Sequence, residues 1–411
     1  MGIVRWIGWG ACAGVAALAA PLFLTQNTLS PSLSKVVQGD RVEKPVKVDL
    51  SGLDLMRLDL RPQEVTTPLP GGRTAVLTLD PVVQRAAVRV MKKYNVPEAG
   101  VVAMNTKTGE LIAYASHVSE GAKFDVNARA EAPAASVFKV VTASTLVEKG
   151  GLTHETEQCY RGGRSQISAD ELRDDPERDK WCATLGIALG RSLNVVFGRL
   201  ARKHLTPEDI TEMGGALGFG AEVPFAVKND APQIHIPEEP LEFARTAAGF
   251  WNTSLSPLAA ASLAQTVANQ GVALKPRIVS SVRKGGHTLW QAPDEKVVLR
   301  RAMKPETAEE VTKMMRQTIS GGSGYKTFHD RRGNSFLPRL DVAGKTGTLT
   351  RHKENRHYTW LVAFAPASNP EIAVAALVVN TPRWRIKGPD LARDVLRAYF
   401  AEKGAPGVSA P

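Results

Sequence analysis

The chain contains 411 residues, 43% of them hydrophobic and 23% charged, and its formal net charge is +11. This is an ordinary globular composition that can build one large or two modest domains, and it contains no internal repeat or low-complexity tract. The positive charge would attract anionic lipid head groups and wall polymers. It is spread along the chain without interleaved aromatic residues, which argues against nucleic acid as a partner.

The first 25 residues are strongly apolar. After Arg5 no charged residue occurs from Trp6 to Leu24, which is about the length that crosses a bilayer. This length favours an uncleaved anchor; the alternatives are a signal peptide cut after the small-x-small run that ends at Ala19, or a buried soluble helix. We therefore predict that residues 1–25 are a membrane anchor or signal segment, and that the rest of the chain lies outside the cytoplasm at the cell membrane.

Residues 26–70 contain Pro, Ser, Asp and Lys, and their only regular pattern is the short alternation VDLSGLDLMRLDL. This composition predicts a linker or stalk with at most one or two strands. The globular domain is predicted to cover residues 71–403 and to be followed by a flexible tail at residues 404–411.

The globular part is predicted to open with a helix and a hairpin. Asp80 and Pro81 have the residue types of an N-cap and a first helical position, and Val83, Ala86 and Val90 form an apolar face after them. The stretch AGVVAMNTKTGELIAYAS then predicts two strands around the turn TKTGE.

A nearly all-apolar helix is predicted after Pro133, and it carries Ser136 and Lys139 three residues apart. Residues i and i+3 share one helical face, so the hydroxyl and the amine are expected within hydrogen-bond reach. Burial would lower the pKa of the amine, and a neutral Lys139 could then take the proton of Ser136 and activate it as a nucleophile. The alternative is a surface serine beside a lysine whose stem lies along apolar surface.

The same Ser-x-x-Lys spacing occurs three more times, starting at Ser32, Ser281 and Ser323. Ser32 lies in a polar stretch, Ser281 precedes the loop KGGH, and Ser323 stands in SGGSGYK, where glycines disfavour a helix. Only Ser136 begins an apolar helix, and its first-turn position would direct free backbone N–H groups at the alkoxide.

Cys159 and Cys182 form an even pair, because the third cysteine, Cys12, lies in the N-terminal apolar segment. In an exported domain they are predicted to form a disulfide, which the chain-entropy model values at about 3 kcal/mol for a loop of this length. Two unpaired buried thiols are the alternative. The eight histidines are scattered and no Cys/His cluster has metal-ligand spacing, so no metal and no other cofactor is predicted.

Further helices and then strands are predicted after the Ser136 helix. The helices are TLGIALGRSLNVVFGRLARKH, TPEDITEMGGALG capped by Thr206, and SPLAAASLAQTVANQG capped by Ser256. The strands are LDVAGKTGTLT, YTWLVAFAP and EIAVAALVVN, with a last helix at about Asp390–Glu402. Strands at both ends of the domain indicate an α+β fold, in which an antiparallel sheet is flanked by helices and carries an inserted all-helical region.

Two more stretches could complete an acyl-transfer site, which needs a second proton relay, donors for an oxyanion and a cation for an anionic substrate end. Ser192 and Asn194 stand in a helical context that their propensities disfavour, and a polar turn between two short helices is the alternative. The run from Lys345 to Thr348 would lie on a strand beside a cleft, with Gly347 letting a substrate backbone come close.

The order Ser-x-x-Lys, Ser-x-Asn and Lys-Thr-Gly resembles the motif set of penicillin-binding proteins and serine β-lactamases. Ser136-Val-Phe-Lys139, Ser192-Leu-Asn194 and Lys345-Thr-Gly347 stand at separations similar to those of the penicillin-binding transpeptidase domain, and the flanking stretches agree over roughly residues 70–400. The resemblance implies a membrane-anchored peptidoglycan D,D-transpeptidase. It would attack the D-Ala-D-Ala end of a stem peptide and pass the acyl group to a neighbouring stem amine. β-Lactams and proteins of cell-wall synthesis are the further partners that it suggests.

The same resemblance assigns roles to the motif residues. Ser136 would be the nucleophile and Lys139 its base, Ser192 would relay a proton to the leaving amine, and Asn194 would orient Lys139 and the substrate amide. The backbone N–H groups of Ser136 and Thr348 would form an oxyanion hole, whose loss usually costs about 100- to 1,000-fold in rate.

Lys345, Thr346 and Thr348 would hold the substrate carboxylate. One departure from the family stands beside the nucleophile, where Ala134 and Ala135 replace a frequent Pro-Gly.

Three other functions fit the same motifs. A β-lactamase would hydrolyse its acyl-enzyme, but neither Glu-x-x-Leu-Asn between Ser192 and Lys345 nor Tyr-Gly-Asn occurs, and the second motif ends in Asn194 instead of Val. The other two are a D,D-carboxypeptidase that uses water as acceptor, and a non-catalytic protein that binds β-lactams or wall peptides.

Overall fold

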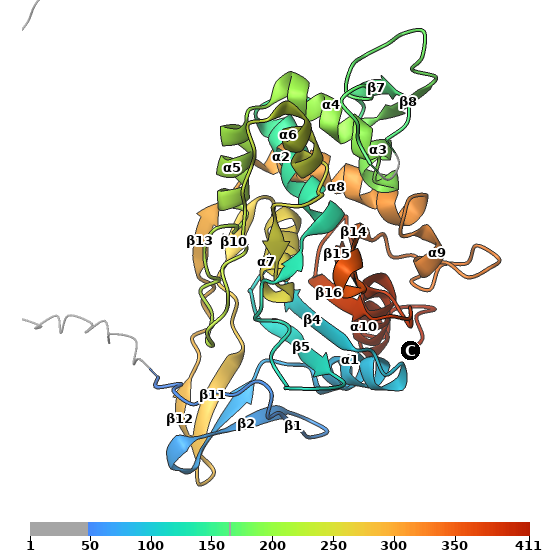
Figure 1. Cartoon of the computed structure of the whole chain (residues 1–411). Coiled ribbons are helices and arrows are strands. Elements are labelled where there is room, and N and C mark those ends of the chain that lie inside the picture. Colours follow the sequence, from blue (N-terminus) through green and yellow to red (C-terminus); the bar gives the residue numbers. More distant parts are fainter. Residues whose placement is uncertain (1–47, 164–165) are drawn as a thin grey trace, which may run out of the picture. The chain divides into compact units, whose positions relative to one another are not determined.

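A five-stranded antiparallel sheet organises the computed structural model, which describes residues 48–163 and 166–411 (Figure 1). The strand order is β14-β15-β16-β4-β5, so three strands from the end of the chain lie beside two much earlier ones. The strands are β4 (Glu98–Asn105), β5 (Leu111–Val118), β14 (Ala343–Arg351), β15 (Arg356–Ala365) and β16 (Ile372–Asn380). The predicted α+β plan, with an antiparallel sheet built from both ends of the domain, is confirmed.

Helices bury both faces of this sheet. On β4, Val101 belongs to the core formed with α1 (Pro81–Lys93) and α10 (Gly388–Glu402), whereas Val102 belongs to the core that includes α7 (Pro257–Ala268). Neighbouring residues thus point to opposite faces, as in any strand. Because both faces need apolar side chains, the strands are nearly continuous hydrophobic runs, such as IAVAALVVN in β16.

All but the last of the helices between β5 and β14 form the inserted region on the α7 side of the sheet (Figure 1). Thr206 forms a capping box with Asp209 at the start of α5, and Ser256 accepts a hydrogen bond from the Ala259 backbone N–H at the start of α7, so both predicted caps are present. Besides α7 these helices are α2 (Lys139–Glu148), α3 (Leu185–Arg191), α4 (Asn194–His204), α5 (Pro207–Ala216), α6 (Pro240–Ala247) and α8 (Pro305–Ser320). The last helix before β14, α9 (Tyr325–Phe328), packs with α10 instead.

The predicted continuous helix over residues 184–204 is wrong. α3 ends at Arg191, Ser192 adopts a left-handed backbone conformation with φ 59° and ψ 45°, and α4 begins at Asn194. A non-glycine residue in this conformation interrupts a right-handed helix. The alternative interpretation, a polar turn between two short helices, is therefore the correct one.

Residues 48–70 pack as part of the domain, which corrects the predicted stalk and its boundary at residue 71. They supply the first two strands of a second antiparallel sheet with the order β1-β2-β3-β11-β12. Val65 is fully buried in the core, and Leu55 and Leu69 belong to the same core. The strands are β1 (Asp59–Leu60), β2 (Val65–Leu69), β3 (Arg73–Leu77), β11 (Val279–Lys284) and β12 (His287–Gln291).

The predicted tail at residues 404–411 contacts the domain at a few points, although most of its residues are exposed. Arg397 Nη2 donates hydrogen bonds to Ser409 Oγ at 3.0 Å and to the Ala410 carbonyl at 3.3 Å. Val408 is partly buried against the core beside α10.

The predicted membrane segment, residues 1–25, and residues 26–47 of the predicted linker lie outside the described residues. None of the helices within the described ranges combines the length and the apolar character needed to cross a membrane.

Candidate active site

Ser136 and Lys139 lie together at the start of α2, although the local helix differs from the prediction. Ser136 belongs to the 3-10 helix η2 (Ala135–Phe138), and Lys139 is the first residue of α2. Side chains three residues apart eclipse each other in a 3-10 helix, so this geometry brings the two groups closer than an α-helix would. The distance between Lys139 Nζ and Ser136 Oγ is 3.1 Å.

The Lys139 amine is fully buried and held by two more acceptors. It donates to Asn194 Oδ1 at 2.7 Å and to the Ala248 carbonyl. Burial lowers the pKa of Lys139 well below its usual value, and the nearby charge of Lys345 lowers it further. The neutral amine that a general base needs is thus favoured where it faces a serine hydroxyl.

Ser192 and Lys345 form a second pair across the cleft. The left-handed turn at Ser192 ends α3, and Lys345 on β14 donates from Nζ to Ser192 Oγ at 3.0 Å. Lys345 Nζ also donates to the Thr346 carbonyl at 2.9 Å. Burial lowers the pKa of Lys345 to about 7. Two lysines of depressed pKa therefore each face one serine hydroxyl, which is an arrangement able to move protons.

β14 is an edge strand of the main sheet, and it presents alternate residues to the cleft. Thr346 and Thr348 line the cavity, and Thr346 Oγ1 lies 2.5 Å from Ser323 Oγ. Gly347 points the other way, because a Cβ atom there would meet Val137 and Trp360 at 3.2 Å. Its absent side chain lets η2 pack closely on β14, which differs from the predicted close approach of a substrate backbone.

The three motifs meet at one cavity of about 410 Å³. Its described lining includes Ser136, Ser192, Asn194, Thr346 and Thr348, whereas the Lys139 and Lys345 amines reach its wall through their hydrogen bonds. Sequence reasoning missed five lining residues: Arg191, Ala248, Gly249, Phe250 and Ser323.

The sequence indicates that Ser323 begins a chance copy of the Ser-x-x-Lys pattern, and we do not assign it the role of nucleophile. The glycines around it do, however, form the loop that follows α8 and borders the cavity. A glycine-rich loop directly after a helix was the available signal.

The backbone before the nucleophile is under strain. Ala135 has φ 50°, in the left-handed region that favours glycine, at the position where the family resemblance predicts Gly. Gly249 has φ 76°, and a Cβ atom there would lie 2.4 Å from the Ala135 carbonyl oxygen. The segments that contain Ala135 and Gly249 are therefore in close contact, and this contact fixes the position of Ser136.

β7 (Glu157–Tyr160) and β8 (Trp181–Thr184) form a hairpin directly before α3, and the structure joins Cys159 to Cys182 by a disulfide across it. Together with Glu157, the two sulfurs form the one group of candidate metal ligands within the described residues. Because both sulfurs are in the disulfide, neither offers the thiolate that a metal site needs.

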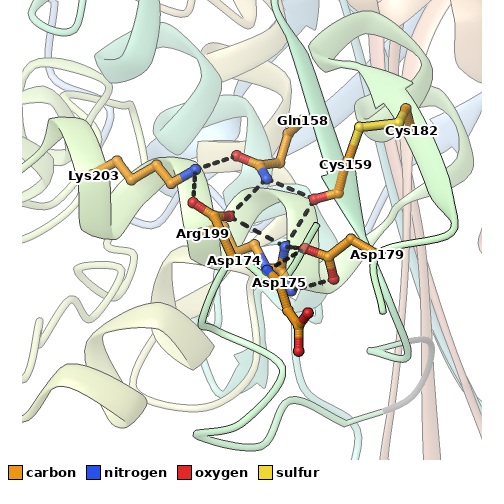
Figure 2. The surroundings of a disulfide bond; sticks show 8 residues. All are labelled: Gln158, Cys159, Asp174, Asp175, Asp179, Cys182, Arg199 and Lys203. Carbon is orange, nitrogen blue, oxygen red and sulfur yellow. Dashed lines mark hydrogen bonds and ion pairs between the residues drawn. A yellow bond between two sulfur atoms is a disulfide. The ribbon is translucent and has the colours of Figure 1, made fainter. Parts of the chain in front are cut away.

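A buried arginine anchors this hairpin to α4 (Figure 2). Arg199 is fully buried, and it donates to the Cys159 carbonyl at 2.8 Å and to the Glu171 carbonyl at 2.7 Å. Its guanidinium also holds both carboxylate oxygens of Asp179, at 2.6 and 3.0 Å. The hydrogen bond from Arg199 keeps the pKa of Asp179 far below its usual range.

We expect Arg199→Met to destabilise the domain by about 3 kcal/mol, because a largely buried carboxylate and two carbonyls each lose a hydrogen-bond donor. Arg178→Met is the matched control, since its side chain is 57% exposed and pairs with an equally exposed Asp170. Denaturant unfolding of both variants measures the difference. Equal midpoints for the two variants would contradict the anchoring role of Arg199.

Comparison with known proteins agrees with this geometry. The family model of the penicillin binding protein transpeptidase domain matches residues 99–397, which is most of the chain. The chain belongs to this family. The match begins in β4 and ends in α10, so it contains the main sheet, the inserted helices and all three motifs.

Relatives in this family are similar over most of this chain. The chain is 27% identical to the peptidoglycan D,D-transpeptidase PbpA of Mycobacterium tuberculosis, over 88% of this chain and 78% of that protein. It is 25% identical to stage V sporulation protein D of Bacillus subtilis, over 76% of this chain and 51% of that protein.

Solved structures of family members share the fold. The D,D-transpeptidase domain of a peptidoglycan glycosyltransferase from Eggerthella lenta superposes with a TM-score of 0.66 at 24% identity, covering 80% of this chain and 83% of that one. A ceftriaxone acyl-enzyme of penicillin-binding protein A from Mycobacterium tuberculosis superposes with a TM-score of 0.63 at 22% identity, covering 78% and 79%.

Proposed function

We propose that the chain is a serine-type peptidoglycan D,D-transpeptidase, which forms an acyl-enzyme on Ser136, cross-links stem peptides and is acylated by penicillin. The observation that carries the proposal is the buried Lys139 amine, held between Ser136 Oγ and Asn194 Oδ1 in a cavity of peptide-binding size. The PbpA relatives are named for this activity, and the family is named for its binding of penicillin.

The first half-reaction would use the two serine–lysine pairs in turn. Ser136 Oγ attacks the carbonyl carbon of the penultimate D-Ala, and the neutral Lys139 takes its proton. Backbone N–H groups of Ser136 and Thr348 stabilise the oxyanion. The C–N bond then breaks, and Ser192 gives a proton to the leaving D-Ala amine and regains one through Lys345, 3.0 Å away.

The second half-reaction reverses these transfers. An acceptor amine attacks the ester carbon and loses a proton to the Ser192–Lys345 pair, and the new amide bond forms. The ester C–O bond breaks, and Ser136 regains its proton from Lys139.

Transfer is favoured over hydrolysis by the composition of the cavity. None of its described lining residues is Asp or Glu, so no lining carboxylate is present to activate water, as a glutamate does in one class of β-lactamase. A D,D-carboxypeptidase remains the second candidate, because water could replace the acceptor amine in the same cycle.

We further propose that the domain works outside the cytoplasm, held at the membrane by its N-terminal segment. The disulfide between Cys159 and Cys182 supports this location, since such bonds persist in oxidising compartments.

The test is the site and the fate of a penicillin adduct. We expect one adduct per chain, mapped by peptide mass spectrometry to Ser136, with a lifetime of many minutes after unlabelled drug is added. Ser144→Ala is the matched control, because Ser144 lies on α2, directly after η2, with its hydroxyl bonded to the Val140 carbonyl. An adduct elsewhere, or its release within seconds with catalytic loss of the drug, would refute the proposal.

The pKa of about 7 for Lys345 predicts a pH effect on carboxylate binding. The ligand-free protein loses the ammonium above this pH, so kcat/KM for an anionic donor peptide should fall about tenfold per pH unit beyond it. In Lys345→Arg the fall in kcat/KM should move to a pH above the measurable range, because arginine keeps its charge. An unchanged alkaline limb in that variant would contradict the assignment.

The same shift affects stability with a defined sign. The folded pKa of Lys345 lies below its ordinary value of 10.5, so the unfolded chain binds more protons between about pH 7 and 10.5. This group therefore makes the free energy of unfolding rise with pH across that window.

A further inference from the structure

A second cavity of about 690 Å³ adjoins the catalytic cavity, and the two share Arg191 and Ser192. It lies between the β7–β8 hairpin and the turn that joins α3 to α4. Its described lining is Tyr160, Gly162, Gly163, Trp181, Arg191, Ser192, Leu193 and Val195. A pocket of this size can hold a short stretch of peptide.

The hairpin supplies an aromatic wall to this cavity. Trp181 is 59% exposed, the most exposed of the large hydrophobic residues that the structure describes. It pairs across the hairpin with Tyr160, and their ring centroids are 6.2 Å apart. Exposed aromatic side chains on a fixed scaffold are typical of binding surfaces.

Arg191 gives the cavity a cation that no carboxylate neutralises. Its guanidinium makes no hydrogen bond or ion pair with any other described residue, and neither cavity has an Asp or Glu in its described lining. In contrast, Arg161, Arg178 and Arg199 of the same region are each paired with aspartates. A free guanidinium between two cavities is suited to a ligand carboxylate.

The aromatic wall is held in place before any ligand arrives. The disulfide crosses the hairpin one residue from Tyr160 and Trp181, and the Arg199 anchor fixes the Cys159 carbonyl to α4 (Figure 2). α4 begins at Asn194, which is a hydrogen-bond acceptor of Lys139. Little ordering is therefore needed when a ligand binds, which favours affinity.

We propose that this second cavity is the acceptor subsite, which binds the stem peptide whose amine attacks the acyl-enzyme. The inference rests on the proposed function, in which Ser192 takes the proton of the attacking amine. Because Ser192 lines both cavities, an amine that comes from the second cavity passes this hydroxyl on its way to the ester on Ser136. Arg191 binds a carboxylate of the acceptor peptide, and Trp181 packs against its apolar part.

The acceptor chemistry is therefore a peptide with one free amine and at least one carboxylate. The reaction stays balanced: the amine nitrogen forms the amide, the Ser136 ester bond breaks, the amine proton goes to the Ser192–Lys345 pair, and Ser136 is protonated by Lys139. The structure gives the two half-reactions separate binding surfaces, which makes them separable by mutation.

The experiment uses the full chain with a thioester acyl-D-Ala donor and two acceptors. One acceptor is a short peptide with a free side-chain amine and a carboxylate, and the other is the same peptide with that carboxylate amidated. Transfer product, hydrolysis product and the rate of penicillin acylation are measured for each variant. Penicillin acylation reports the first half-reaction and does not involve the acceptor.

We expect Trp181→Ala to raise the concentration of either acceptor needed for half-saturation about fivefold or more. The rate of penicillin acylation should stay within a factor of two of wild type. Trp181→Phe should recover most of the transfer. Trp384→Ala is the matched control, because Trp384 is also largely exposed but does not line the second cavity. Arg191→Gln should raise the half-saturating concentration of the carboxylate acceptor about tenfold, and it should change that of the amidated acceptor little.

Unchanged acceptor dependence in Trp181→Ala, or an equal loss of acylation and transfer, would overturn the subsite. So would inhibition of transfer by a wall disaccharide without a peptide, which would make the cavity a sugar site. Failure of the proposed function is distinct, since wild type itself would then form no adduct or give hydrolysis only at every acceptor concentration.

Discussion

Lys139→Ala is expected to lower the rate of penicillin acylation about 100- to 10,000-fold, which is the usual contribution of a positioned general base. The Lys139 amine is 3.1 Å from Ser136 Oγ, and Lys345, the other buried lysine at the site, is bonded to Ser192 instead. Among the described residues, no other side chain forms a hydrogen bond with Ser136 Oγ and could replace the amine. The serine hydroxyl would therefore remain protonated and weakly nucleophilic.

The pH profile separates loss of the base from a structural effect. Neutral Lys139 is the active form, so wild-type acylation should rise with pH through the lowered pKa of this amine. The variant should lose that rise. Ser136→Ala defines the zero level of labelling.

Controls must show that the variant folds, because truncation leaves Asn194 Oδ1 and the Ala248 carbonyl without their buried donor. Lys139→Met keeps most of the side-chain volume and should be equally inactive. Lys149→Ala is the matched lysine control, since Lys149 follows the same helix and pairs with Glu212 at the surface. A folded Lys139→Met variant that acylates at more than a tenth of the wild-type rate would contradict the role of Lys139.

The features that could be predicted from the sequence are the local ones. The Ser136–Lys139 contact depends on a spacing of three residues, which serves equally well in an α-helix and in the 3-10 helix observed. The caps at Asp80, Thr206 and Ser256 depend on four consecutive residues each. Such signals are complete within a short window of sequence.

The features that were missed depend on distant partners. β2 pairs with β3, which pairs with β11 some two hundred residues later, so the alternation in residues 48–70 was interpreted as a stalk. The left-handed residue at the break, Ser192, is itself neither Gly nor Pro, and its conformation is supported by the hydrogen bond from Lys345. Neither conformation follows from local propensity.

Gly249 shows the same limit within the active site. Its φ of 76° and its contact with the Ala135 carbonyl appear only once two distant loops meet. The sequence around it, AAGFW, carries no sign of a close approach to the nucleophile. It is also the glycine at which an added methyl group would meet the backbone on either side of the Ala135–Ser136 peptide bond.

Gly249→Ala is expected to reduce penicillin acylation about 100-fold, since misplacement of a nucleophile by about 1 Å costs this much. The new Cβ would lie 2.4 Å from the Ala135 oxygen and 3.0 Å from the Ser136 Cα, so the backbone of η2 must move. The adjacent Ala248 carbonyl, which accepts from Lys139, would shift with it. Both partners of the proton transfer are displaced by one substitution.

Gly220→Ala isolates this contact from the backbone strain. Gly220 has a similar φ of 81°, but no heavy atom lies within 4 Å of the position of its Cβ. Both variants should lose about 1–2 kcal/mol of stability from the left-handed conformation. Only Gly249→Ala should lose acylation beyond that, when both are compared well below their melting temperatures. Equal acylation rates in the two folded variants would mean that the Gly249–Ala135 contact does not position Ser136.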